Sequence, residues 1–167
     1  MFGAVDRKSK LLWVTLMSKK SEAGKALRKL NAFCEAQGVK CRSFHCDGAP
    51  EFVGPDSEAS KFIKEELKCQ LTYSAAHEPR GNGLMERNWR WLGDDMRSCL
   101  KWSCLENRYA AYALLNCTRT SWHLPSRDSD DTPWSLFTGK PSEVRHLRPF
   151  GCVCYPKVRE LNASEVL

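Results

Sequence analysis

The spacing of hydrophobic residues predicts alternating strands and helices in the first part of the chain. Residues 11–17 form a short apolar run bounded by charged residues, as expected of a strand that is buried on both faces. From Ser21 to Gly38, apolar residues recur every three or four positions, which predicts a helix capped by Ser21 and ended by Gly38. Residues 39–46 predict a second strand, and a turn sequence with glycine and proline follows directly after Asp47.

The same reasoning predicts a shorter helix and strand, and then two longer helices. Residues 57–67 carry apolar side chains at helical spacing, and residues 70–73 have the composition of a brief strand. A polar loop over residues 74–83 precedes a long helical pattern over residues 84–101. A further helix is predicted over residues 106–119. The order of strands and helices is that of an α/β fold, and a chain of 167 residues fits one domain.

The helix predicted over residues 84–101 has two distinct faces. One face carries an apolar stripe wide enough to pack on a sheet, made of Met85, Trp89, Leu92, Met96, Cys99 and Leu100. One position further on, a row with the same spacing is headed by a carboxylate and is otherwise mainly basic: Glu86, Arg90, Gly93, Arg97 and Lys101. This row is either the solvated face of an amphipathic helix or a surface that follows a phosphate backbone. A glycine inside a helix costs about 1 kcal/mol relative to alanine, so Gly93 indicates the close approach of another backbone or a ligand.

Composition adds a basic charge balance to this pattern. Lysine and arginine outnumber aspartate and glutamate by 26 to 20, which gives a net charge of +6 and favours an anionic partner. The N-terminus lacks the pattern of a signal peptide, and no apolar run approaches the roughly 20 residues that a membrane span needs. We therefore expect an intracellular protein without a membrane segment. Nine cysteines, an odd number spread through the predicted elements without the paired spacing of a zinc site, are expected to be reduced, buried thiols.

Three stretches of sequence resemble the integrases of copia-type retrotransposons. Residues 80–87 resemble the Asn-Gly-x-x-Glu-Arg signature that precedes the long helix of that family. Residues 46–52 look like a degraded form of its Asp-Asn-Gly-Gly-Glu-Phe motif, which keeps Asp47, Glu51 and Phe52. Residues 132–152 are similar in order and spacing to the family's Thr-Pro, Gly-x-x-Pro and His-Leu-Arg-x-Phe-Gly-Cys series.

A further match near the start extends the resemblance over almost the whole chain. Val5 and Asp6, with Ser9 and Lys10, resemble the family's Val-Asp-x-x-Ser-Arg stretch, in which the last position is usually arginine. The resemblance implies an RNase H-like mixed sheet flanked by helices. It also implies a partial catalytic core domain over residues 1–121. The prolines spread over residues 122–167 predict that this segment is an irregular extension of the core.

The same resemblance implies a metal site. In that family three carboxylates bind Mg²⁺ or Mn²⁺, and Asp47 and Glu86 match the second and the third, as catalytic and metal-binding residues. The first carboxylate lies on a strand upstream of the matching stretch, so that strand would precede Met1 and the chain looks N-terminally truncated. Asp6 occupies a different, non-catalytic position.

DNA is the partner that both the charge and the resemblance favour. Donor side chains near the two carboxylates are suited to phosphate oxygens. The candidates for DNA contact are Arg80, Asn82, Arg87, Arg90, Arg97 and Lys101. The resemblance further implies a homo-oligomer in the intact protein and a nuclear location.

Two functions remain open from the sequence. The first is DNA integration by an integrase core fragment of a retrotransposon polyprotein, a metal-dependent phosphoryl transfer. With two of three carboxylates, the chain alone is expected to show little or no catalysis. The alternative is a decayed or domesticated remnant that binds nucleic acid without catalysis. Each carboxylate also has a simpler explanation, since Asp47 can cap a turn and Glu86 can favour a helix N-terminus.

Overall fold

A β-hairpin opens the chain in the computed structural model. The structure describes residues 1–54, 57–74, 83–125 and 129–155. Strands β1 (Phe2–Val5) and β2 (Leu12–Thr15) pair antiparallel, with Phe2 opposite Thr15. The strand expected over residues 11–17 is confirmed at its centre. Strand β1 was not predicted, because its four residues are too few to show a pattern.

Asp6 shapes the turn of this hairpin. Its Oδ2 accepts hydrogen bonds from the backbone N–H and the hydroxyl of Ser9, both at 2.7 Å. The Ser9 hydroxyl oxygen in turn accepts from the backbone N–H of Leu11 at 3.2 Å. Lys10, at the end of the turn, has a φ of 63°, a left-handed conformation held by its backbone hydrogen bond to the Asp6 carbonyl. Asp6 is therefore a structural residue of the turn.

The first long helix follows the hairpin. A short 3-10 turn, η1 (Lys20–Glu22), leads into α1 (Ala23–Ala36). The predicted N-cap was wrong: Ser21 lies inside η1, and the Glu22 carboxylate instead accepts from the backbone N–H groups of Ser18 and Lys19. The predicted end of the helix is confirmed, because Gly38 takes up a left-handed φ of 73° just after it.

A second, parallel sheet comes next. Strands β3 (Ser43–Cys46) and β4 (Gln70–Tyr73) pair with Ser43 opposite Gln70. Between them lie three short helical segments, α2 (Pro50–Val53), α3 (Glu58–Lys61) and the π-helical η2 (Phe62–Glu66). The helix expected over residues 57–67 and the strand over residues 70–73 are confirmed. Of the strand expected over residues 39–46, only the last four residues form β3.

Three helices complete the described chain. The helix α4 (Gly83–Ser103) and, after a 3-10 turn η3 (Asn107–Tyr109), the helix α5 (Ala110–Ser121) confirm the two longest predicted helices. The segment from Trp122 onward is not wholly irregular, since it contains α6 (Pro133–Thr138). Thr132 caps α6 by accepting from the Ser135 N–H at 3.1 Å, a capping box that the sequence analysis did not use.

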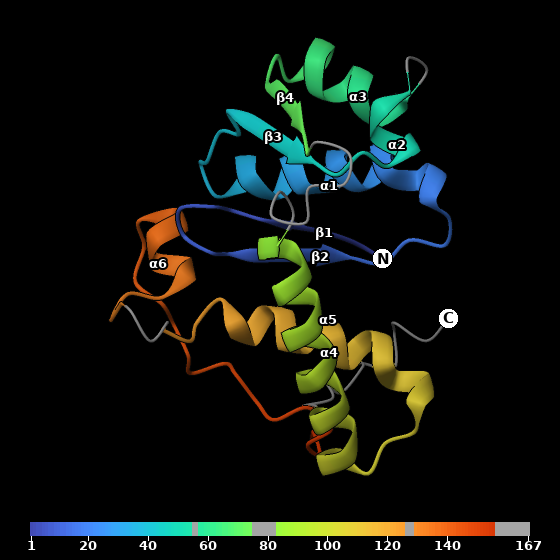
Figure 1. Ribbon diagram of the computed structural model, residues 1–167. Helices are drawn as coiled ribbons and strands as arrows, with labels where there is room; N and C mark the ends of the chain where they lie inside the picture. The colour runs from blue at the N-terminus through green and yellow to red at the C-terminus, as the bar shows by residue number, and fades with distance from the viewer. Residues whose placement is uncertain (55–56, 75–82, 126–128, 156–167) are drawn as a thin grey trace, which may run out of the picture.

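The hairpin separates two buried clusters (Figure 1). On one face, Phe2, Ala4 and Trp13 pack against a cluster built by α1, α3 and η2, which Phe44 of β3 and Leu71 of β4 also contact. On the other face, a second cluster joins the hairpin to α4 and α5; its buried members are Leu12, Val14, Leu92, Leu114 and Cys117. Both faces of the hairpin are thus covered by helices. The expected α/β class is confirmed.

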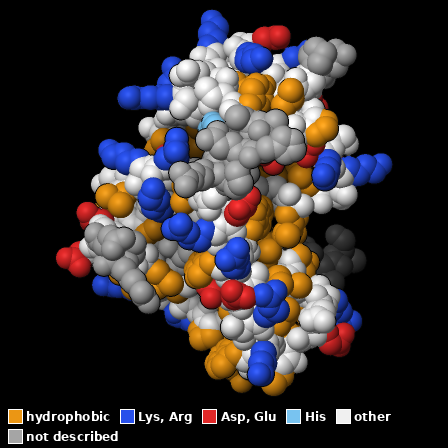
Figure 2. Space-filling view, viewed as in Figure 1, with side chains coloured by type: hydrophobic (Ala, Val, Ile, Leu, Met, Phe, Trp, Pro, Cys, Tyr) orange, Lys and Arg blue, Asp and Glu red, His pale blue; other side chains and the backbone are white. Residues whose placement is uncertain are grey.

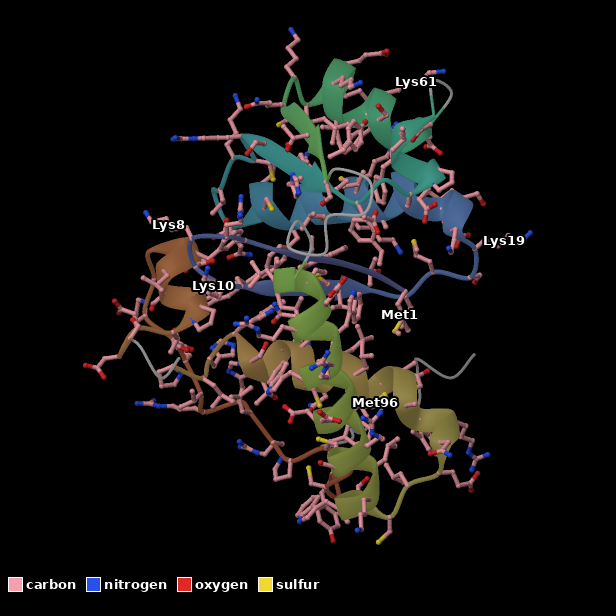
Figure 3. The ribbon with its side chains drawn as sticks, in the orientation of Figure 1. Met1, Lys8, Lys10, Lys19, Lys61 and Met96 are labelled. Atoms are coloured by element: carbon pink, nitrogen blue, oxygen red, sulfur yellow. The ribbon has the colours of Figure 1, made fainter. Side chains whose placement is uncertain are left out.

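The apolar stripe predicted on α4 forms part of the second cluster. Leu92 is completely buried, and Leu100 is almost so. Met85, Trp89, Met96 and Cys99 pack around the same cluster, and Figure 3 shows the Met96 side chain on this helix. In the described part of the chain, every helix is too short or too polar to cross a membrane.

Candidate metal and nucleic-acid site

Asp47 directly follows β3, as predicted, and its side chain is exposed. The strand remains paired to its end, because the backbone N–H of Ser74 donates to the Cys46 carbonyl at 2.9 Å. Beside this end, the two ring nitrogens of His45 hydrogen bond with the hydroxyls of Thr72 at 2.9 Å and Ser74 at 3.0 Å. Burial, and then the neighbouring Asp47 charge, raise the pKa of the Cys46 thiol to about 12. Asp47 therefore stands at the solvent-exposed end of a fixed strand.

Glu86 lies in the first turn of α4, as predicted, and is also exposed. The preceding residue, Met85, fixes this turn against the hairpin. A Cβ atom built on Gly3 would collide with the Met85 side chain and would lie 2.6 Å from the Trp89 ring. Gly3 is thus needed for the close approach of α4 to β1, and it sets the position of the turn that carries Glu86.

The segments that carry the two carboxylates both reach the amino end of β1. The ring of Phe52, in the helix α2 that follows Asp47, lies 6.2 Å from the ring of Phe2. The Tyr73 hydroxyl donates to the Phe52 carbonyl at 2.9 Å and so ties α2 to the end of β4. Because Phe2 and Gly3 are adjacent, α2 and the first turn of α4 contact consecutive residues on opposite faces of the same strand.

The described residues offer few ligands for a metal. Among them, no three His, Cys, Asp or Glu side chains come together in a way that could hold a metal ion. Mg²⁺ prefers oxygen ligands in an octahedron and often keeps several waters when only one or two carboxylates bind it. Two carboxylates suit one weakly bound ion better than a two-ion centre, which needs ions about 3.5–4 Å apart and more shared ligands.

The basic row predicted on α4 is solvent-exposed. The candidates in the described part of the chain are Arg87, Arg90, Arg97 and Lys101, and all four side chains are exposed. One is engaged within the helix, since Arg97 Nη2 lies 2.5 Å from the Asp94 carboxylate. Figure 2 shows basic side chains alternating with carboxylates on this face, not a continuous basic field. The remaining two candidates, Arg80 and Asn82, lie outside the described residues.

Among the described residues, Gly93 does not mark a close approach of another backbone. Around a Cβ atom built on Gly93, the nearest atom is Nη1 of Arg97, at an ordinary 3.6 Å. The predicted close approach of another backbone was therefore wrong for the described part of the chain. A ligand on this side of α4 stays a prediction.

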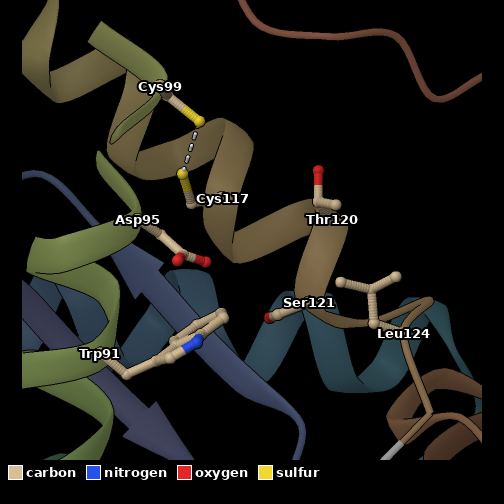
Figure 4. Close-up of a pocket in the computed structure, with 7 residues that line it drawn as sticks. All are labelled: Trp91, Asp95, Cys99, Cys117, Thr120, Ser121 and Leu124. Carbon is tan, nitrogen blue, oxygen red and sulfur yellow. Dashed lines mark hydrogen bonds between the residues drawn. The ribbon is translucent and has the colours of Figure 1, made fainter. Parts of the chain in front are cut away.

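The cysteines differ in part from the expectation of buried thiols. All nine are free, and Cys104 and Cys154 are exposed. Between α4 and α5, the sulfurs of Cys99 and Cys117 lie 3.5 Å apart, beside a small cavity of about 80 Å³ that Asp95 also lines (Figure 4). Burial and the hydrogen bond with Cys99 raise the pKa of Cys117 to about 12, so this thiol is a packing group at neutral pH.

A second, larger hollow of about 840 Å³ was not predicted from the sequence. Side chains from α5, from α6 and from the chain that follows α6 line it, among them Arg119, Trp134 and Arg148. Trp134 and Arg148 fall within the 132–152 series, but Arg119 lies outside it on α5, and spacing along the chain does not bring these three together. Their convergence is a property of the tertiary structure.

Comparisons with known proteins give distant relatives. No family model matches the chain. Over 163 residues it is 25% identical to the retrovirus-related Pol polyprotein from transposon TNT 1-94 of Nicotiana tabacum. This match covers 92% of the chain and 12% of that polyprotein. It is 25% identical over 164 residues to the corresponding polyprotein from transposon RE1 of Arabidopsis thaliana, and 24% identical to that from transposon RE2, each over 97% of the chain and 11% of the polyprotein.

These similarities support a function related to retroelements. They extend over nearly the whole chain, as the motif resemblance did. The chain spans about one eighth or less of the length of these relatives. A polyprotein contains several activities, so the activity of this part is a separate question.

Proposed function

We propose that this chain is the integrase core part of a retrotransposon Pol polyprotein, acting on DNA by metal-dependent strand transfer. The observation that carries the proposal is that two segments pack on opposite faces of the amino end of β1. One segment follows Asp47 and the other carries Glu86. Carboxylates at a strand end and on an adjacent helix start suit a shared Mg²⁺ or Mn²⁺ ion. Such an ion would offset charge on the phosphate and activate the attacking hydroxyl.

The sheet arrangement supports an RNase H-like core. Among the described strands, β1 pairs with β2 and β3 pairs with β4, so β1 and β3 each have an uncovered edge. Both pairs pack on the same buried cluster, and Figure 1 shows β3 on the side of β4 that faces the hairpin. We propose that one further strand of the intact polyprotein lies between β1 and β3 and carries the remaining carboxylate. It would join the two pairs into one mixed sheet.

Metal binding by the chain tests the proposal directly. Mn²⁺ titration, followed by the broadening of NMR signals, is expected to affect the residues near Asp47 and Glu86 first. Asp47→Asn and Glu86→Gln should each weaken this effect strongly. The matched control is Asp94→Asn, an exposed carboxylate on the same helix that pairs with Arg97. Equal broadening in all three variants would exclude a metal site on Asp47 and Glu86.

A strand-transfer assay separates the enzyme from a binding remnant. With two of three expected carboxylates, the chain alone should join a labelled oligonucleotide to target DNA weakly or not at all. A longer protein that supplies the additional strand should be active, and Glu86→Gln should abolish its activity. A longer protein that binds DNA but stays inactive with Mg²⁺ and Mn²⁺ would support the non-catalytic remnant. The changed Asp47–Phe52 motif is the feature that favours this second function.

A further inference from the structure

The hollow beside α5 and α6 has the size of a ligand site. Its volume of about 840 Å³ is within the range of pockets that enclose small ligands, and it opens to solvent. Neither Asp47 nor Glu86 lines it, and nor do the basic residues of α4. Its chemistry can therefore be considered apart from the proposed metal site.

Positive charge predominates around this hollow. Arg119 comes from the last turn of α5, while Lys140 and Arg148 come from the chain after α6, and all three are exposed. Among the described residues that line it, Glu143 is the one carboxylate. Arg148 is held in place because its Nη1 donates to the carbonyls of Arg145 at 2.6 Å and Leu147 at 2.8 Å. The hollow is thus suited to an anionic ligand.

Aromatic rings form one wall of the hollow. Trp122 and Trp134 stack with their centroids 5.8 Å apart and their planes at 16°. His123 lies 5.8 Å from the Trp134 ring, and His146 lies edge-on to His123 at 5.4 Å. Phe150 also lines the hollow. The wall presents ring surface beside the cations.

This wall is anchored in the core. Trp122 donates from its Nε1 to the Leu12 carbonyl of β2 at 2.5 Å. Its other ring neighbour is Phe33 of α1, at 5.3 Å, which packs against the first buried cluster. His123 is fixed by a 2.7 Å hydrogen bond between its Nδ1 and the Ser142 hydroxyl. Because these rings are already ordered, a ligand would lose little affinity to ordering the wall.

We propose that this hollow binds a short stretch of single-stranded nucleic acid, with bases against the ring wall and phosphates near Arg119, Lys140 and Arg148. Cations that follow a backbone and rings on which bases stack are the usual combination in single-strand binding. A duplex presents its bases inside the helix, so it could use the cations but not the rings. An acidic peptide would use the same cations without needing the ring wall. The site does not require a metal ion.

Fluorescence anisotropy with a labelled oligothymidylate of about 12 nucleotides tests this proposal. The full chain is used, with EDTA present so that metal binding plays no part. The double variant Arg119→Gln/Lys140→Gln is expected to bind about tenfold more weakly, because two phosphate contacts are lost. The control Lys25→Gln/Lys29→Gln removes the same charge from exposed positions on α1 and should change binding less than about twofold. Equal loss in the two double variants would overturn the proposal.

Three further measurements complete the test. Raising NaCl from about 50 to 200 mM should weaken binding roughly 20-fold if three phosphates are contacted. A duplex of equal length and a poly-glutamate peptide should compete poorly, and equal competition by either would overturn the single-strand assignment. Phe150→Ala should weaken oligothymidylate binding but not the binding of inorganic phosphate. Because EDTA removes the metal, a negative result here leaves the strand-transfer proposal standing, and an inactive integrase assay leaves this one standing.

Discussion

Single residues in this chain act mainly by fixing the backbone near the candidate site. Asp6 illustrates why a carboxylate near a motif is not thereby a ligand. Its carboxylate accepts two hydrogen bonds from Ser9 in the hairpin turn. Gly3 acts by the absence of a side chain, because Met85 and Trp89 occupy the space that a Cβ atom would need. Neither role is visible from composition or periodicity.

Replacing Gly3 should loosen the packing of α4 on the hairpin. Gly3→Ala places a methyl group against the Trp89 ring, and we expect a loss of about 1–3 kcal/mol in the free energy of unfolding from overpacking. Urea denaturation measures it. The control is Gly48→Ala, where a Cβ atom meets open space and stability should stay equal or rise by up to about 1 kcal/mol. Similar losses in both variants would contradict the proposed contact.

At the scale of elements, α4 and α5 form the main support for the site. Their contact is filled by Leu92, Leu114 and the thiols of Cys99 and Cys117. The hairpin packs on this pair of helices. Its contact with Met85 positions the turn that carries Glu86. At its far end, α5 leads into the ring wall of the large hollow.

Removing the side chain of Leu92 should destabilise this support strongly. Leu92 is fully buried, and Leu92→Ala is expected to cost about 2–5 kcal/mol through lost burial and the cavity that remains. Thermal unfolding followed by circular dichroism measures the effect. Leu136→Ala on α6 is the control, since Leu136 is 41% exposed and its loss should cost much less. An equal cost would mean that α4 does not carry the core contact described above.

The ring wall should make stability depend on pH. Burial, followed by the charge of His146, lowers the pKa of His123 below its ordinary 6.5. Below pH 6.5 the unfolded chain therefore binds a proton at this position more readily than the folded chain does, and stability falls as the pH drops. The melting temperature of His123→Gln should fall less between about pH 7.5 and 5 than that of the unchanged protein. Parallel curves would show that His123 does not contribute.

At the scale of the whole molecule, two small sheets depend on the helices around them. A two-stranded sheet is marginally stable by itself, and each pair here has an edge that no described strand covers. The two pairs are joined through the shared buried cluster rather than by a described strand. The helices should therefore be the most persistent part of the molecule.

Hydrogen exchange tests this order of stability. Amides in the middle of α4 and α5 should exchange most slowly, because these helices enclose the second buried cluster. Amides of β1 and β3 should exchange faster in this chain, and more slowly in a longer protein in which a further strand pairs with both edges. Slow exchange of β1 and β3 in the chain alone would contradict the idea of uncovered edges.

The sequence by itself determined the periodic elements and the positions of the two carboxylates along them. The helices α1, α4 and α5 were predicted because many turns repeat the same apolar spacing, and Asp47 and Glu86 were correctly assigned to a strand end and a helix start. Strand β1 and helix α6 were missed because four to six residues carry too little pattern.

Only the tertiary structure decided what lies beside what. The contacts of Phe52 with Phe2 and of Met85 with Gly3 bring distant segments to one strand, and no local pattern encodes that distance. The large hollow likewise has Trp122 in its wall, and that side chain donates a hydrogen bond to Leu12, 110 positions earlier in the chain. Local propensity follows from neighbouring residues, whereas a site depends on packing between residues that the sequence keeps apart.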